Sequence, residues 1–206
     1  MIPKIVHVIW IGPRFFPYAD FLESWSRHNP GWQVRLWTDE NRPHLGVNEQ
    51  IYRRLPAQAM RADLLRLHLL AEYGGLYSDA DSTCLAPVDL LVEGRTLCAM
   101  TGNRGRTANG TLAATPGHPG MVALVEGARK HYEKLRRAQR GGRVWQVHDV
   151  FGGRYVRGVL DGCDDFVRWP RRLVCQRRDQ GPDTVIVHNS ANTWHRELGR
   201  KGKVRV

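Results

Sequence analysis

The segment from Arg61 to Asp81, RADLLRLHLLAEYGGLYSDAD, restricts the possible folds of this chain more than any other. Leucines recur through its first part with the spacing of a helix that has one heavily apolar side. Gly74 and Gly75 are expected to end that helix, and the apolar residues after them to form a short buried strand. This order is typical of an α/β fold in which Asp79 and Asp81 lie at the carboxyl edge of a sheet.

Asp79 and Asp81 are separated by Ala80, which adds no competing group. In an extended segment, side chains at i and i+2 point the same way, so both carboxylates are expected to converge on one cation. Mg²⁺ or Mn²⁺ typically takes one or two protein carboxylates and keeps its other positions for water and phosphate oxygens. A lone D-x-D also occurs in turns and helix caps, so the motif alone leaves both uses open.

Asp63 and Arg66 lie three residues apart on the expected helix and therefore share one face. Arginine binds anionic oxygens as a fork, and aspartate accepts hydrogen bonds from sugar hydroxyls. The pair suits a substrate that carries phosphate and hydroxyl groups, although an Asp-x-x-Arg pair alone is also common as a surface ion pair.

The whole pattern resembles the DXD-containing sugar transferases, which include fungal initiating mannosyltransferases, capsular and lipopolysaccharide glycosyltransferases, and the catalytic domains of the large clostridial glucosylating toxins. The resemblance rests on Asp63, Arg66, Tyr73, Gly74, Gly75, Tyr77, Asp79 and Asp81, and it covers residues 1–100 well and the remainder in fragments. It implies a GT-A, Rossmann-like fold with a central, mostly parallel sheet flanked by helices. It also implies catalytic roles for Asp63, Arg66, Asp79 and Asp81.

The N-terminal run from Ile2 to Gly12 is similar to the opening strand and nucleotide loop of that family. The resemblance implies that Trp10 stacks on the nucleotide base and that Ile9, Ile11 and Tyr77 also contact the nucleotide sugar. The donor would be a UDP-sugar or GDP-sugar bound with Mn²⁺ or Mg²⁺. Transfer would proceed with retention at the anomeric carbon.

Asn109, followed by a Thr-Pro-Gly-His-Pro turn over 115–119, is similar to the family's asparagine near the donor sugar. Asn-Gly is equally a strong hairpin signal, so both interpretations stay open. The Phe-Gly-Gly run over 151–153 occupies the place of a Thr-Gly-Pro turn on the acceptor side of relatives, but Thr and Pro are absent here. His148 and Asp149 could supply a catalytic base or could cap the next helix.

The segment from His188 to Trp194, HNSANTW, resembles the family's closing segment over the metal and diphosphate. His188 is the favoured third metal ligand, because neutral imidazole binds Mn²⁺. Asn189 or Asn192 could ligate through an amide oxygen instead, and Trp194 could cover the diphosphate. A histidine after a strand can also be purely structural.

Strands and helices are expected to alternate along the chain. The pattern predicts strands over 4–11, 32–37, 76–78, 109–114 and 184–188, and helices over 18–28, 48–55, 61–73 and 121–138. With 206 residues, the chain is expected to form a single catalytic domain. Residues 1–100 would be its nucleotide-sugar half, 101–195 its acceptor half and closing segment, and 196–206 a basic tail.

Composition adds expectations about location and chemistry. No apolar run approaches the roughly 20 residues of a membrane span, and no signal peptide is recognisable. A cytoplasmic protein is expected, of a bacterium or of a host cell if virus-encoded. The four cysteines are widely spaced, which favours reduced structural thiols over disulfides or zinc.

The formal charge of +11 indicates a polyanionic acceptor, because basic surfaces attract phosphates. DNA with a hydroxylated base, which would have to be flipped out of the duplex, is slightly favoured. A phosphorylated capsule or lipopolysaccharide saccharide at an anionic membrane and a protein acceptor are alternatives. The charge could also serve solubility alone or reflect an arginine-rich genome.

The rival classes of function are a metal-dependent nuclease and a non-catalytic nucleic-acid-binding protein. The sequence does not indicate the oligomeric state.

Overall fold

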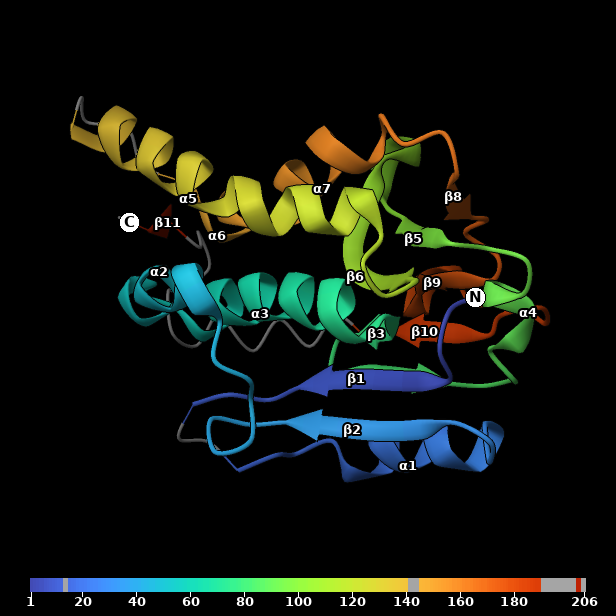
Figure 1. Ribbon diagram of the computed structural model, residues 1–206. Coiled ribbons are helices and arrows are strands. Elements are labelled where there is room, and N and C mark those ends of the chain that lie inside the picture. Colours follow the sequence, from blue (N-terminus) through green and yellow to red (C-terminus); the bar gives the residue numbers. More distant parts are fainter. Residues whose placement is uncertain (13–14, 141–144, 190–202, 205–206) are drawn as a thin grey trace.

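The computed structural model describes residues 1–12, 15–140, 145–189 and 203–204, and it is built on a six-stranded sheet (Figure 1). The strands follow the order β2 (Gln33–Trp37), β1 (Ile5–Ile9), β3 (Gly75–Ser78), β6 (Thr107–Ala114), β5 (Leu97–Thr101) and β8 (Phe166–Trp169). Neighbouring strands are parallel except at β6, which runs antiparallel to both β3 and β5. The central, mostly parallel sheet predicted from the sequence is confirmed.

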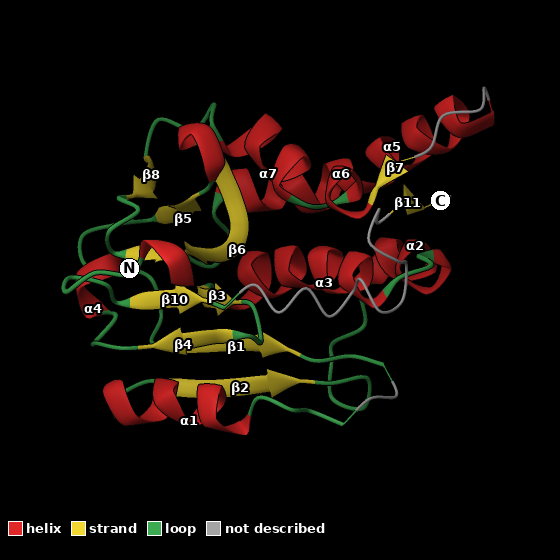
Figure 2. Ribbon diagram, turned by 180° about the vertical axis from the view of Figure 1, so that it is seen from behind, coloured by secondary structure: helices red, strands yellow, loops and turns green. Residues whose placement is uncertain are grey.

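Each face of the sheet packs against its own hydrophobic core. One core is formed with α3 (Gln58–Tyr73), α5 (Pro119–Arg140), α6 (Val147–Val150), α7 (Gly153–Leu160) and α2 (Glu49–Arg54). The other is formed with α1 (Ala19–His28), α4 (Asp89–Val92) and a three-stranded sheet of β4 (Ser82–Cys84), β10 (Ile186–His188) and β9 (Val174–Gln176). Figures 1 and 2 show α3 and α5 side by side, with the C-terminal end of α5 projecting from the body. A two-stranded sheet pairs β7 (Trp145–Gln146) with β11 (Lys203–Val204).

The glycine pair between α3 and β3 is required by the backbone and by close packing. Gly74 has a φ of 63° and Gly75 a φ of 90°, a region that glycine occupies without steric cost. A Cβ atom on Gly74 would lie 2.6 Å from Cδ of Pro116, and one on Gly75 would lie 2.6 Å from the carbonyl oxygen of Ile5. The chain can therefore leave α3 and enter the buried strand β3 within two residues.

The sequence predicted the elements of the first half more completely than those of the second. The short strands β4, β8 and β9 were not expected, because each spans at most four residues. The hairpin interpretation of Asn109–Gly110 is wrong, since both residues lie inside β6. Within the described residues, no helix combines the length and apolar character that a membrane span requires. All four cysteines are free, as predicted.

His7 is a buried polar group that joins β1 to its surroundings. Its Nε2 lies 2.8 Å from the carbonyl oxygen of Gly74, and its Nδ1 accepts a hydrogen bond of 3.0 Å from Nε1 of Trp37. Burial lowers the pKa of His7 from 6.5 to about 4, with Arg35 adding to the decrease and the Gly74 hydrogen bond opposing it. The ring is therefore neutral in the folded protein at neutral pH.

This neutral histidine makes part of the stability dependent on pH. Because the pKa is lower in the folded than in the unfolded chain, the contribution is complete above pH 6.5 and is lost as the pH falls toward about 4. The loss reaches on the order of 3 kcal/mol once the ring is protonated in both states. Urea denaturation of the wild type and of His7→Gln across this range is expected to show a stability difference that shrinks with acidification. A constant difference would contradict the assignment.

Candidate active site at the end of β3

Asp79 and Asp81 follow β3 in a tight turn that leads directly into β4. The backbone amide of Ser82 donates a hydrogen bond of 2.9 Å to the carbonyl oxygen of Asp79, which closes the turn. The expectation of an extended Asp-Ala-Asp segment is therefore wrong. The turn nevertheless brings both carboxylates toward one histidine.

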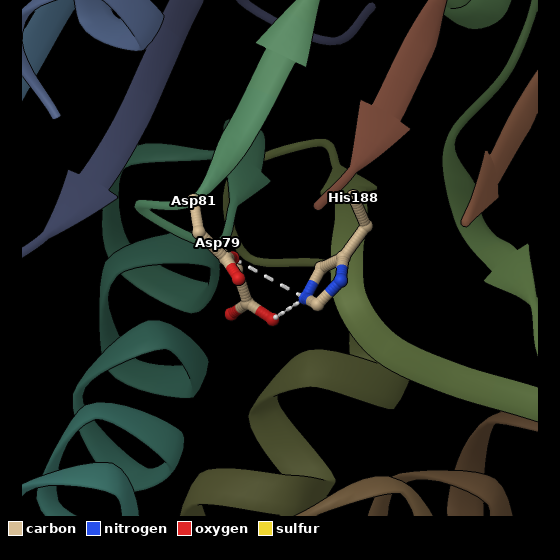
Figure 3. Close-up of side chains that lie close together, drawn as sticks. All are labelled: Asp79, Asp81 and His188. Atoms are coloured by element: carbon tan, nitrogen blue, oxygen red, sulfur yellow. Dashed lines mark hydrogen bonds and ion pairs between the residues drawn. The ribbon is translucent and has the colours of Figure 1, made fainter. Parts of the chain in front are cut away.

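That histidine is His188, from the last residue of β10. Because β10 pairs antiparallel with β4, His188 lies opposite Ser82 and beside the turn. Its Nε2 lies 2.9 Å from Oδ2 of Asp79 and 3.4 Å from Oδ1 of Asp81 (Figure 3). One ligand atom from each of the three side chains lies within 4.8 Å of the others. Two carboxylates and an imidazole are a donor set that Mn²⁺ or Mg²⁺ accepts, so the residues fit the predicted cation.

The charges at this cluster are balanced by mutual pairing. Burial alone would lower the pKa of His188, but the Asp79 hydrogen bond and the charges of Asp79 and Asp81 raise it to about 9. Burial would likewise raise the pKa of Asp79, but Arg66 and His188 hold it below its usual value. A metal ligand must be deprotonated, so a cation bound by all three groups would displace the His188 proton.

Arg66 and Asp63 form a buried network directly behind the cluster. Nη2 of Arg66 lies 2.8 Å from Oδ1 of Asp63, and its Nη1 lies 3.2 Å from Oδ1 of Asp79. The same Nη1 donates to the carbonyl oxygen of Asn109, whose Nδ2 donates to Oδ1 of Asp63 at 2.8 Å. Burial raises the pKa of Asp63 to about 6 despite the Arg66 charge. The interpretation of Asp63 and Arg66 as a surface ion pair is wrong, because both side chains are buried.

Tyr77 reaches the same network from β3. Its hydroxyl donates a hydrogen bond of 2.7 Å to Oδ1 of Asp79, and Cζ of Arg66 lies 4.3 Å from the centre of its ring. Burial raises the pKa of Tyr77 well above its ordinary value, so the hydroxyl stays protonated. In this geometry Tyr77 orients Asp79, and its contact with a nucleotide stays a prediction.

Trp10 follows β1, which is paired in parallel with β3, so both strands end at the same edge of the sheet. Its ring packs edge-on against Phe16 and Tyr18, with centroids 5.7 and 5.5 Å away. The side chains of Ile9 and Ile11 are buried in the core, so any nucleotide contact from these residues would be made by the backbone. The stacking of Trp10 on a base stays a prediction.

Asn189 joins the end of β10 to the Asp79–Asp81 turn. Its backbone amide and its Nδ2 both donate to the carbonyl oxygen of Asp81, at 3.0 and 2.8 Å, and its Nδ2 also donates to Thr83. These bonds position the turn, while a ligand role for the amide oxygen stays a prediction. Asn192 and Trp194, the other residues predicted in this segment, lie outside the described residues.

Asp149 has the capping role that the sequence left open. Its Oδ2 accepts a hydrogen bond of 3.3 Å from the backbone amide of Gln146 at the start of α6, and its Oδ1 lies 3.1 Å from Nη1 of Arg154. The structure therefore supports helix capping by Asp149.

Gly110 is a site residue that the sequence analysis did not single out. A Cβ atom on it would lie 2.9 Å from Oδ2 of Asp79, 3.3 Å from Cδ2 of His188 and 3.3 Å from Sδ of Met100. Its carbonyl oxygen also accepts a hydrogen bond of 2.8 Å from the amide of Asp79. In the sequence, the Asn-Gly pair indicates only a turn. The contact of Gly110 with His188 depends on strand pairing between residues far apart in the chain, so the sequence did not predict it.

We expect Gly110→Ala to weaken cation binding about tenfold while the protein stays folded, because the added methyl group displaces the Asp79 carboxylate. Isothermal titration with Mn²⁺ measures the effect. Gly158→Ala is the matched control, since its site on α7 is open and exposed. That helical substitution is expected to stabilise the protein by about 1 kcal/mol and to leave Mn²⁺ affinity unchanged. Equal Mn²⁺ affinities for the two variants would contradict the packing argument.

The fold and the cluster together define a GT-A glycosyltransferase architecture. Residues 18–97 match the family model described as a glycosyltransferase sugar-binding region containing a DXD motif. The predicted resemblance is thus confirmed, and over these residues the chain is similar to DXD-containing glycosyltransferases.

Individual relatives show how far the similarity extends. Inositol phosphoceramide mannosyltransferase 1 of Schizosaccharomyces pombe is 29% identical over 139 residues, which cover 63% of this chain and 43% of that protein. Mannosyl phosphorylinositol ceramide synthase CSH1 of Saccharomyces cerevisiae is 27% identical, over 65% of this chain and 37% of that protein. The chain thus spans less than half the length of these curated relatives.

Solved structures agree on the fold at low sequence identity. The PaToxG glycosyltransferase aligns with a TM-score of 0.57 and 18% identity, covering 77% of this chain and 69% of that one. The glycosyltransferase GlyE of Streptococcus pneumoniae aligns with a TM-score of 0.57 and 16% identity, covering 90% of this chain and 54% of that one.

Proposed function

We propose that this chain transfers a sugar from a nucleotide-sugar donor to an acceptor hydroxyl, with a divalent cation held by Asp79, Asp81 and His188. The observation that carries the proposal is the convergence of these three side chains in front of the buried Arg66–Asp63–Asn109 network. Residues 1–206 would act as one catalytic domain in the cytoplasm.

The cation, when bound, would neutralise the charge that develops on the diphosphate leaving group. Arg66 is buried and bonded to Asp63, Asp79 and Asn109, so its role would be to hold the two carboxylates in place. Oδ1 of Asp63 takes the bonds from Arg66 and Asn109, which leaves its second oxygen for a sugar hydroxyl. Trp10 would stack on the base of a UDP- or GDP-sugar. The family resemblance supports retention, which the anomeric configuration of the product would test by NMR.

The acceptor is proposed to carry phosphate. The net charge of +11 favours an anionic acceptor, and two relatives are named for acting on inositol phosphoceramide or making mannosyl phosphorylinositol ceramide. These names favour a phosphorylated lipid headgroup over the hydroxylated-base DNA suggested by charge alone. Capsule saccharides, lipopolysaccharides and proteins are the other candidate acceptors to be screened.

Thermal denaturation with a panel of sugar nucleotides tests the proposal. We expect one donor to raise the melting temperature only with Mn²⁺ or Mg²⁺, because the cation and the diphosphate bind together. A ligand at about 100 times its Kd would add roughly 2.7 kcal/mol of stability. Stabilisation by no sugar nucleotide would instead favour the nuclease or the non-catalytic binding protein.

A further inference from the structure

An exposed basic patch borders the candidate site and takes no part in holding the cation or the donor. We define the arginine rim as Arg104, Arg106, Arg177 and Arg178, all of which are exposed. The first two belong to the short turn η2 (Asn103–Gly105) and the residue after it, and the other two open the turn η3 (Arg177–Asp179). Nη2 of Arg178 donates to Oδ1 of Asn103 at 3.3 Å, so the two turns form one surface.

The strand pairing places this rim beside the metal cluster. Gln176 pairs with His188 across the parallel strands β9 and β10, and Arg177 follows Gln176 directly. Arg106 precedes Asn109 by three residues at the start of β6, which corresponds to about 10 Å of strand. The backbones of Arg106 and Arg177 therefore lie on the order of 10 Å from the groups that would hold the cation and the donor sugar.

The positive charge of the rim is largely uncompensated. Among the described residues, no carboxylate oxygen lies within 4.0 Å of the guanidinium groups of Arg104, Arg106 or Arg177. Arg178 makes only a long contact of 3.8 Å with Asp179, which already pairs with Arg171 at 2.5 Å. Exposed guanidinium groups in this arrangement favour a phosphate ligand, which arginine binds as a fork.

The backbone of η2 adds an independent observation. Arg104 has a φ of 57° and is the only non-glycine residue with a positive φ in the described part of the chain. The following residue, Gly105, has a φ of 70° without steric cost, whereas a positive φ is disfavoured for an arginine. A strained φ at an exposed residue beside the candidate site is the kind of backbone outlier from which a functional role can be inferred.

We propose that the arginine rim binds a phosphate group of the acceptor and thereby presents the acceptor hydroxyl to the donor sugar. This inference rests on the proposed function and specifies its acceptor as a phosphodiester next to a polyol, as in an inositol phosphate headgroup. A membrane lipid and a soluble phosphorylated saccharide offer the same chemistry.

Two variants of equal charge test the rim. The rim variant combines Arg104→Gln, Arg106→Gln and Arg177→Gln. The control combines Arg136→Gln, Arg137→Gln and Arg140→Gln at the projecting end of α5, and each set removes three positive charges. The probes are glycerophosphoinositol, inorganic phosphate, phosphatidylcholine vesicles with and without phosphatidylinositol, and duplex DNA. We expect the rim variant to bind glycerophosphoinositol at least about tenfold more weakly and the control to bind it like the wild type.

Each other outcome is informative. Equal losses in the two variants, or none in either, would overturn the proposal, as would a rim effect confined to duplex DNA. If the rim variant loses affinity for glycerophosphoinositol, the headgroup is identified as the ligand. If it loses affinity for inorganic phosphate alone, the proposal that the ligand carries a polyol is overturned. The wild type is assayed in parallel for donor stabilisation with Mn²⁺. If no donor stabilises the wild type with Mn²⁺ but the rim variant still binds the headgroup more weakly than the wild type, the proposed function is wrong and the phosphate site is retained.

Arg104→Gly separates binding from folding. Because glycine relieves the strained φ, we expect this variant to melt at the same or a higher temperature than the wild type and still to lose headgroup affinity. Lower stability with unchanged affinity would show that Arg104 is structural and would overturn its part in the rim.

Discussion

An Asp81→Asn variant is expected to lose metal-dependent sugar-nucleotide hydrolysis by about a hundredfold or more while staying folded. The substitution replaces a charged ligand oxygen that lies 3.4 Å from Nε2 of His188 by a neutral amide. The backbone carbonyl of Asp81 keeps its two bonds from Asn189, so the turn is expected to persist. Initial rates over a range of Mn²⁺ concentrations measure the loss.

A charge-matched control distinguishes this effect from a general change in electrostatics. Asp164→Asn removes one negative charge from an exposed position outside the network. That variant is expected to hydrolyse the donor at the wild-type rate. Undiminished turnover in Asp81→Asn, with circular dichroism unchanged, would remove Asp81 from the site.

Replacing Arg66 by methionine is expected to cause the largest loss of stability in this chain, about 3–5 kcal/mol. The guanidinium lies between the buried carboxylates of Asp63 and Asp79, and its removal leaves both without their main counter-charge. Because the pKa of Asp63 is already raised to about 6, the variant is expected to bind a proton there near neutral pH. Chemical denaturation gives the change in the free energy of unfolding.

The exposed ion pair on α5 provides the comparison. Nε of Arg129 lies 3.2 Å from Glu133, with both side chains largely exposed, and such pairs contribute at most about 1 kcal/mol. Arg129→Met should therefore change stability only slightly. If Arg66→Met does not fold, Arg66→Lys keeps the charge without the fork and is expected to lose less. A cost for the Arg66 variants no larger than that for Arg129→Met would contradict the buried network.

The sequence predicted the parts of the site that are local in the chain. Asp63 and Arg66 could be placed on one helix face, and the paired glycines marked the transition from helix to strand. The geometry of the Asp-Ala-Asp segment was predicted incorrectly. A short apolar run can be followed either by more extended strand or by a turn, and here it is followed by a turn.

Long-range pairing accounts for what the sequence could not supply. His188 was proposed as a ligand through family resemblance, and its actual approach depends on the antiparallel pairing of β10 with β4. Gly110 gave no signal of a role in the site, because that role depends on its closeness to the Asp79 carboxylate and the His188 imidazole. Such contacts are set by sheet topology, which local periodicity does not encode.

The reversed direction of β6 has a consequence for how proteins with this fold could diversify. Asn109 and Gly110 reach the site from within β6, and the connection that carries Arg104 and Arg106 enters that strand at its start, with Arg106 three residues before Asn109. The loop can therefore change in length or charge while the pairing of Thr111–Ala114 with β3 and the hydrogen bond from the Asp79 amide to Gly110 hold the donor-side residues in place. The acceptor could then change while the donor stays the same, and exchange of the loop over 102–106 becomes a direct way to change the acceptor.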